Sequence, residues 1–249
     1  MSQDWITIRH PRPEARIRLY CLPHAGAGAS VFLAWGKTAP DWLEVCSVQL
    51  PGRENRHGET LYSDFAALIA AFGPVLACHV DQPYVLFGHS MGALLAFELS
   101  RWMQSGQWRT PSLLVVSAYR APNRPPRDRS TANLPDDEFL ASVAALNGTP
   151  AQLLKDPRLR RLLLPVLRAD YAVCESYVFE PVPLLDCPVS VYGGINDTDI
   201  SRVDLEAWSA LTSASTSVQL FWGDHFFIRS AQERVLAVVF AQVAGQTGN

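Results

Sequence analysis

Short apolar runs alternate along this chain with longer segments in which apolar residues recur every three or four positions. The periodic segments predict amphipathic helices at 62–78, 93–104, 204–211 and 231–243. The short runs predict six strands, at 17–22, 45–50, 84–87, 113–117, 189–192 and 218–222. Because strands and helices follow each other in turn, we expect an α/β fold with a mainly parallel central sheet that is flanked by helices.

One stretch interrupts this alternation. Residues 121–129 are rich in proline and arginine, and helical patterns follow at 136–146, 150–154 and 156–177. We interpret residues of about 133–185 as a helical insertion, which would form a lid over the carboxyl ends of the strands, where such sheets bind ligands. Its apolar residues either pack against each other and the core or line a chamber. They include Phe139, Leu146, Leu153, Leu154, Leu162, Leu163, Leu164, Val166 and Leu167.

Length and composition narrow the class of protein. We expect 249 residues to form a single domain, 1–249, and a net charge of −3 with 18% charged residues disfavours a nucleic-acid partner. The five cysteines are scattered and lack metal-ligand spacing, so we expect reduced thiols and no metal. The first residues are charged and no later run approaches the roughly 18 apolar residues of a membrane span. We therefore expect a cytoplasmic protein that has no membrane partner and is monomeric.

The sequence GHSMG at 88–92 follows a predicted strand directly and opens a predicted helix. This G-x-S-x-G arrangement is typical of the sharp strand-to-helix turn that exposes the nucleophilic serine of the α/β-hydrolase fold. Side chains at the two glycines would collide with neighbouring backbone in such a turn. We therefore predict an α/β-hydrolase fold with Ser90 as nucleophile; the alternative is a tight turn with an incidental serine.

A serine hydroxyl needs a general base, and this fold places its triad along the chain in the order serine, acid, histidine. The histidines at 10, 24, 57, 79 and 89 all precede Ser90, which leaves His225. It lies between the last predicted strand and the last predicted helix, where a loop can deliver an imidazole to the serine. We predict His225 as the base; the alternative is an ordinary surface or core histidine.

The acid that orients the histidine should follow a late strand. Asp197 comes after a strand and a pair of glycines, and it is our choice. Asp199 and Asp204 lie close enough to compete, and we interpret Asp224 as a local loop residue. A turn or helix-cap role is the alternative for Asp197.

Acyl chemistry also needs amides that stabilise an oxyanion. One normally comes from the residue after the nucleophile and the other from the loop after an early strand, which here predicts the backbone N–H groups of Met91 and Ala25. The small residues of the loop 22–29 let a main-chain amide approach a substrate. Gly26 and Gly28 lack the third glycine of a dinucleotide site and the lysine of a P-loop, so we rank phosphate binding lower.

Taken together, these residues closely resemble the type II thioesterases that accompany nonribosomal peptide and polyketide synthases. The resemblance runs over nearly the whole chain. Besides the serine turn, its motifs are LPHAG at 22–26, LPGRENR at 50–56, LPDDEF at 134–139, LPVLRADY at 164–171 and GDHFF at 223–227.

The resemblance implies a stand-alone hydrolase of antibiotic, siderophore or other secondary-metabolite biosynthesis. It would release stalled or wrongly loaded acyl groups from the phosphopantetheine arm of acyl or peptidyl carrier protein domains. It implies the triad Ser90, Asp197 and His225, a lid over an acyl chamber, and no cofactor beyond the carrier's own phosphopantetheine. The family often has two glycines before the histidine, whereas Asp224 precedes it here and places a second carboxylate near the base.

Arginines in two places remain open. Arg53 and Arg56 lie in a family motif, where either structural ion pairing or substrate binding would explain them. Others gather in and near the predicted lid, and carrier domains of this kind are usually acidic, so we hypothesise a docking surface there; an ordinary solvated face is the alternative. These are Arg120, Arg124, Arg127, Arg129, Arg158, Arg160, Arg161 and Arg168.

Three other functions compete with an editing thioesterase. A small-molecule esterase on the same fold would prefer simple esters to carrier-bound acyl groups. An acyltransferase would pass the acyl group to an alcohol or amine, which product analysis with an acceptor would reveal. A noncatalytic partner of a synthase would keep its cellular function without Ser90.

Overall fold

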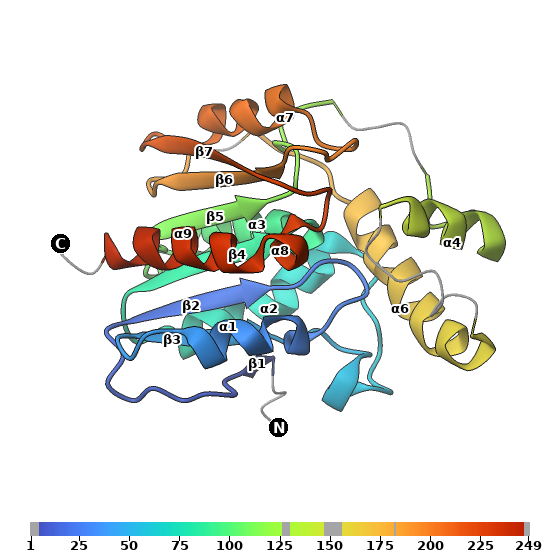
Figure 1. The fold of residues 1–249 in the computed structure, drawn as a ribbon, viewed down its shortest axis with the longest axis horizontal. Coiled ribbons are helices and arrows are strands. Elements are labelled where there is room, and N and C mark those ends of the chain that lie inside the picture. Colours follow the sequence, from blue (N-terminus) through green and yellow to red (C-terminus); the bar gives the residue numbers. More distant parts are fainter. Residues whose placement is uncertain (1–4, 126–129, 147–155, 182, 247–249) are drawn as a thin grey trace.

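One sheet organises the computed structural model, which describes residues 5–125, 130–146, 156–181 and 183–246 (Figure 1). Its strands lie in the order β1-β3-β2-β4-β5-β6-β7, and all neighbours are parallel except β1 and β3. This order confirms the mainly parallel sheet and puts β4, which precedes the serine turn, in the centre. The strands are β1 (Ile6–Thr7), β2 (Ile17–Leu22), β3 (Leu43–Val48), β4 (Tyr84–His89), β5 (Leu113–Ser117), β6 (Val189–Gly194) and β7 (Thr216–Phe221).

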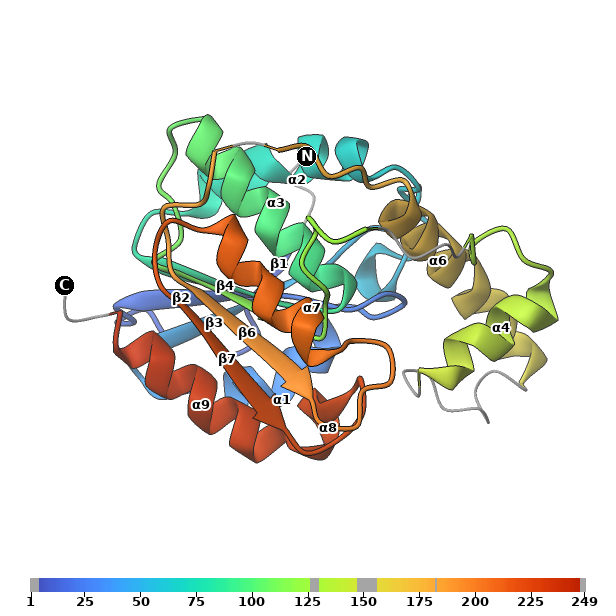
Figure 2. The same ribbon diagram turned by 90° about the horizontal axis from the view of Figure 1, so that it is seen from above.

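Helices cover both faces of the sheet (Figure 2). Alternate residues of β2 show why its apolar run is continuous: Tyr20 and Leu22 belong to the core on one face, and Leu19 and Cys21 to the core on the other. On the first face lie α2 (Phe65–His79), α3 (Met91–Ser105) and α7 (Arg202–Glu206), which continues into a short 3-10 helix, Ala207–Leu211. On the second lie α1 (Leu33–Thr38), the one-turn α8 (Phe227–Ser230) and α9 (Gln232–Ala244).

Polar side chains explain why two of the predicted elements begin earlier than the apolar pattern indicates. The predicted strand 45–50 is β3, which begins at Leu43 because Glu44 is buried in the sheet and accepts a hydrogen bond from Arg18 Nε at 2.8 Å. The predicted helix 204–211 begins earlier, since Ser201 and Asp204 form a capping box. The pattern missed β1, the short helices α1 and α8, and the one-turn segments Ala29–Phe32 and Glu54–Arg56.

The lid lies beyond the carboxyl ends of the strands, as predicted (Figure 1). Its helices are α4 (Asp136–Ala145) and α6 (Pro157–Glu175), while the predicted helix 150–154 lies outside the described residues. Four of the seven named apolar lid residues that the structure describes, Phe139, Leu163, Leu164 and Leu167, belong to a small core of the lid, whereas Leu146 borders a cavity and Leu162 is 51% exposed. The packing alternative therefore accounts for these four residues, and the chamber alternative accounts for Leu146.

Within the described part of the chain, no helix combines the length and the apolar character needed to cross a membrane.

Candidate active site

The turn between β4 and α3 holds Ser90 in an uncommon backbone conformation. Its φ of 54° and ψ of −121° lie where side chains are rarely accommodated, and its amide donates a 2.8 Å hydrogen bond to the Ser117 carbonyl of β5. A Cβ at Gly88 would stand 2.0 Å from the Gly92 oxygen, and one at Gly92 would stand 2.2 Å from the Leu22 oxygen. The glycines are therefore required by backbone packing, as the motif predicted.

The structure brings the three predicted catalytic residues into contact from three strand ends. His225 Nε2 lies 3.0 Å from the Ser90 hydroxyl oxygen, and His225 Nδ1 lies 2.9 Å from Asp197 Oδ2. An ionised carboxylate only accepts hydrogen bonds, so Nδ1 carries the proton and donates it to Asp197. Nε2 is then free to accept the hydroxyl proton of Ser90, which is the arrangement that activates a serine.

The competing carboxylates have other positions. The Asp197 side chain is 1% exposed, and its second oxygen, Oδ1, accepts hydrogen bonds from the amides of Asp199 and Ile200 at 2.8 and 3.2 Å, which fixes its direction. Asp224 Oδ1 accepts the Phe226 amide at 2.8 Å within its own loop, and Asp204 caps α7. Among these carboxylates, Asp197 is the one that the geometry points at the imidazole.

Two further histidines pack beside the base. The rings of His89 and His225 are 5.6 Å apart, and His24 packs against Phe226 at 4.8 Å. Burial lowers the pKa of His24 to about 4 and lowers the pKa of His89 well below its ordinary value. Both rings are therefore neutral at neutral pH and add no positive charge next to His225.

A cavity of about 180 Å³ opens beside the Ser90 hydroxyl. The serine, His225 and both predicted oxyanion residues, Ala25 and Met91, border it. Met91 is the first residue of α3, so its amide has no carbonyl to bond within the helix and can face the cavity. The rest of the lining is mostly apolar or aromatic and comes partly from the lid: Ala118, Tyr119, Arg120, Leu146, Tyr171, Cys174, Asp199 and Ile200.

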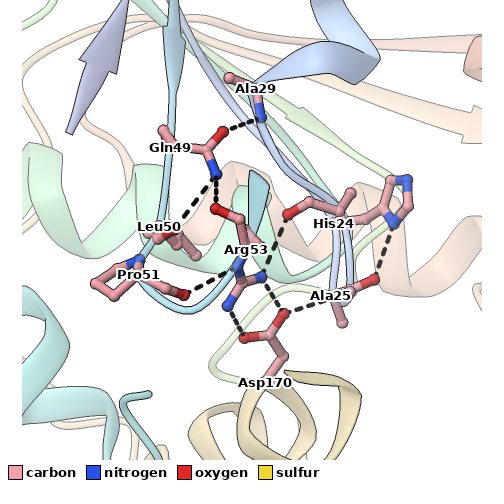
Figure 3. A network of polar contacts seen from close by, with 10 residues as sticks. His24, Ala25, Ala29, Gln49, Leu50, Pro51, Arg53 and Asp170 are labelled. Carbon is pink, nitrogen blue, oxygen red and sulfur yellow. Dashed lines mark hydrogen bonds and ion pairs between the residues drawn. The ribbon is translucent and has the colours of Figure 1, made fainter. Parts of the chain in front are cut away.

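Arg53 and Arg56 are held by structural ion pairs. Arg53 donates two hydrogen bonds to Asp170 of α6, at 2.5 and 2.8 Å (Figure 3). Arg56 pairs with Glu59 through bonds of 3.0 and 2.6 Å and stacks over Trp5 at 4.4 Å. The structural alternative thus accounts for both guanidinium groups. Sequence reasoning missed Asp170, although an aspartate amid the apolar residues of an amphipathic lid helix was a usable signal.

Some of the arginines in and near the lid form ion pairs within the described part of the protein, and others do not. Arg160 pairs with Asp137 at 2.8 Å, and Arg168 pairs with Asp136 at 2.6 Å. Arg158 and Arg161 are exposed and make no ion pair with the residues that the structure describes, whereas 127 and 129 lie outside them. Across those described residues, no three histidine, cysteine or carboxylate side chains gather as a metal site.

Comparisons with known proteins show the family to which the chain belongs. Residues 17–243 match the family model described as a thioesterase domain. Linear gramicidin dehydrogenase LgrE of Brevibacillus parabrevis is 38% identical over 94% of this chain and 90% of its own length. Thioesterase PikA5 of Streptomyces venezuelae is 36% identical over 90% of this chain and 80% of its own. The solved structure of BorB, a type II thioesterase from the borrelidin biosynthetic cluster, shares 35% identity and 99% of each chain with a TM-score of 0.88.

Proposed function

Because this chain belongs to the thioesterase family, we propose that it is an editing type II thioesterase, which hydrolyses acyl groups from the phosphopantetheine arm of carrier protein domains. The carrier domains would be those of a nonribosomal peptide or polyketide synthase; the relation to ClbQ, a 28% identical structure from the colibactin NRPS/PKS pathway, supports this. The observation that carries the proposal is the hydrogen-bonded series Ser90, His225 and Asp197 beside a lid-covered cavity.

Acylation would begin when Ser90 Oγ attacks the thioester carbonyl and His225 Nε2 takes its proton. The carbonyl oxygen becomes an oxyanion, which the amides of Met91 and Ala25 stabilise. When the tetrahedral intermediate collapses, the C–S bond breaks and the imidazolium returns the proton to the departing pantetheine sulfur. The products of this half-reaction are acyl-Ser90 and a free carrier thiol.

Deacylation would repeat the sequence with water in place of Ser90. His225 removes a proton from the water as its oxygen attacks the acyl carbonyl, and Asp197 stabilises the imidazolium that forms. Collapse releases the carboxylic acid, and the proton passes to Ser90 Oγ. A thioester suits this site because its carbonyl is less resonance-stabilised than that of an ester and a thiolate leaves readily.

The experiment that tests the proposal measures acid release by the wild-type protein from an acetyl-loaded carrier protein and from a simple acetate ester. An acetyl group suits the cavity of about 180 Å³. We expect kcat/KM for the carrier substrate to exceed that for the ester by about a hundredfold or more, because binding energy from remote parts of a substrate lowers the barrier. Acetyl-pantetheine alone is the control that separates the thioester from the carrier.

Each other outcome identifies a different function. Preference for the ester would contradict the proposal in favour of a small-molecule esterase. Acyl transfer that needs an added alcohol or amine would indicate an acyltransferase. If neither the acid nor a transfer product formed, a noncatalytic synthase partner would be the better account of this protein.

The second candidate function is that of a dehydrogenase, because the name of the relative LgrE includes this activity. It would need a dinucleotide site, and the glycine loop after β2 carries Gly26 and Gly28 without the third glycine of that motif. A Cβ at Gly28 would meet the Glu54 carboxylate at 2.4 Å, so this side of the loop is already occupied by protein. The site therefore favours hydrolysis.

The exposed arginines of α6 give the docking hypothesis a specific test. Reversing charge in an Arg158→Glu/Arg161→Glu variant should raise KM for an acetyl-loaded acidic carrier about tenfold and leave kcat unchanged, because like charges would then face each other. Acetyl-pantetheine should be hydrolysed as by the wild type. Steady-state kinetics at low and high salt would measure both effects, since exposed charges are screened by salt.

A matched control changes the same charge at the opposite end of the sheet. Arg16 and Arg109 are exposed and precede β2 and β5, whose amino ends face away from the lid. An Arg16→Glu/Arg109→Glu variant should keep the wild-type KM for the carrier. Equal KM values for all three proteins would contradict docking at α6.

A further inference from the structure

The peptide group between Ala25 and Gly26 is held at both of its polar ends (Figure 3). His24 Nδ1 lies 3.0 Å from the Ala25 carbonyl oxygen, and the Gly26 amide donates to Asp170 Oδ2 at 2.7 Å. Arg229 donates to His24 Nε2 at 3.0 Å, so Nε2 is the acceptor and Nδ1 carries the proton that it donates. A peptide group is planar, and fixing both ends fixes its orientation.

Asp170, which accepts the hydrogen bond from the Gly26 amide, belongs to the lid. Asp170 lies on α6, is 2% exposed, and receives both terminal nitrogens of Arg53. Arg53 in turn donates to the carbonyls of Ala27 and Pro51, each at 3.2 Å. A buried carboxylate with three charge-assisted or amide hydrogen bonds has a single allowed direction, and that direction is toward Gly26.

A second contact shows how closely the helix and the loop approach. Gly26 has φ +78°, and a Cβ there would stand 2.5 Å from Leu167 Cδ2. Leu167 and Asp170 are three residues apart, on one face of α6. The lid helix therefore touches the loop through one apolar and one charged side chain.

We propose that Asp170, oriented by Arg53, is a positioning residue that fixes the Ala25–Gly26 peptide and thereby aims the adjacent Ala25 amide at the oxyanion. The lid helix α6 is then part of the oxyanion-stabilising machinery as well as a cover of the cavity. This inference rests on the proposed function, in which the Ala25 amide stabilises the tetrahedral intermediate. Donors act at full strength only when they are already oriented before reaction.

The test replaces the ion pair as a whole, because removing one partner would leave a buried charge uncompensated. In an Arg53→Met/Asp170→Leu variant, kcat for acetyl-pantetheine should fall about tenfold to a hundredfold while KM stays within about twofold. The affinity for a trifluoromethyl ketone analogue of acetyl-pantetheine, which forms a tetrahedral adduct with Ser90, should fall by the same factor as kcat. A merely structural role would not lower kcat and analogue affinity together.

Two further variants separate positioning from general damage. Arg53→Gln/Asp170→Asn keeps a carbonyl oxygen that accepts the Gly26 amide and should recover most of kcat. Arg56→Met/Glu59→Leu removes an equally buried guanidinium of the same segment that does not contact the loop, and it should keep the wild-type kcat. If the control variant loses as much as the test variant, or if analogue affinity is unchanged, the proposal is wrong.

If the ion-pair variants fail to fold, the inference can still be tested at the other end of the peptide group, where His24 donates to the Ala25 carbonyl. His24→Phe keeps the ring contact with Phe226 but removes the donor to the Ala25 carbonyl, and it should show the same fall in kcat at constant KM. An unchanged kcat in folded His24→Phe would overturn the inference. Failure of the proposed function is a separate result, because the wild type would then hydrolyse no thioester while fluorophosphonate labelling still reported Ser90.

Discussion

A Ser90→Ala variant should lose release of acid from an acetyl-loaded carrier, with kcat lower by about 10⁶-fold. The alanine side chain has no hydroxyl group and cannot form the acyl-enzyme. His225 Nε2 then lacks the hydroxyl oxygen that lies 3.0 Å from it in the wild type. Only water could then attack the thioester, without an acyl-enzyme intermediate. Single-turnover release of labelled acetate would measure the loss.

Mass spectrometry provides the complementary observation. Wild-type protein quenched during turnover should carry an acetyl group on the peptide that contains Ser90, and the variant should not. Thermal unfolding is the control, since the substituted alanine must adopt the same backbone conformation and the melting temperature should stay close to that of the wild type. Substantial acid release by a folded Ser90→Ala protein would contradict the assignment of the nucleophile.

An Asp197→Asn variant should lower kcat about 10⁴-fold. The asparagine carbonyl can still accept the amides of Asp199 and Ile200, which turns its NH2 group toward His225 Nδ1. The imidazole must then accept at Nδ1 and carry its proton on Nε2, where it can no longer take a proton from Ser90. The measurement is kcat for acetyl-pantetheine across the pH range in which the wild type is active.

The neighbouring carboxylate gives the matched control. Asp224→Asn makes the same chemical change one residue before the base, and it should alter kcat by no more than about threefold because its Oδ1 accepts the Phe226 amide within its own loop, whereas His225 Nδ1 pairs with Asp197. A larger loss at Asp224 than at Asp197 would exchange their roles. It would also explain why this chain departs from the two glycines that the family often has.

The sequence was most informative where one local rule decides the structure. Runs of buried apolar residues located β2 and β5 to the residue, whereas β3 began earlier than predicted because a charged residue, Glu44, is buried against Arg18. An apolar pattern cannot show that a charge has found a partner 26 positions away. That residues 1–249 form one domain stays a prediction.

The sequence motifs predicted the residues proposed to react, but they did not predict the ion pair that orients the neighbouring loop. Ser90 and His225 could be chosen because the turn motif and the order along the chain left few alternatives. The partner of Arg53 could not, because Asp170 is 117 positions away and only the folded lid brings it there. Sequence reasoning thus found the groups proposed to react and missed the network that orients the loop beside them.

The two ends of α6 differ in their contacts with the body of the protein, and this difference affects how acyl selectivity could be changed by exchanging the lid. Its later part is integral to the body of the protein: Val173 belongs to the main core, and Ser176, just after the helix, accepts the Phe65 amide at 2.9 Å through its hydroxyl. Its first part carries exposed arginines instead. A graft from a relative that ends at about residue 165 should therefore exchange Leu146 in the cavity wall and keep Tyr171 and Cys174 native. A longer graft would change those two residues as well, but it would also import a foreign support for the loop.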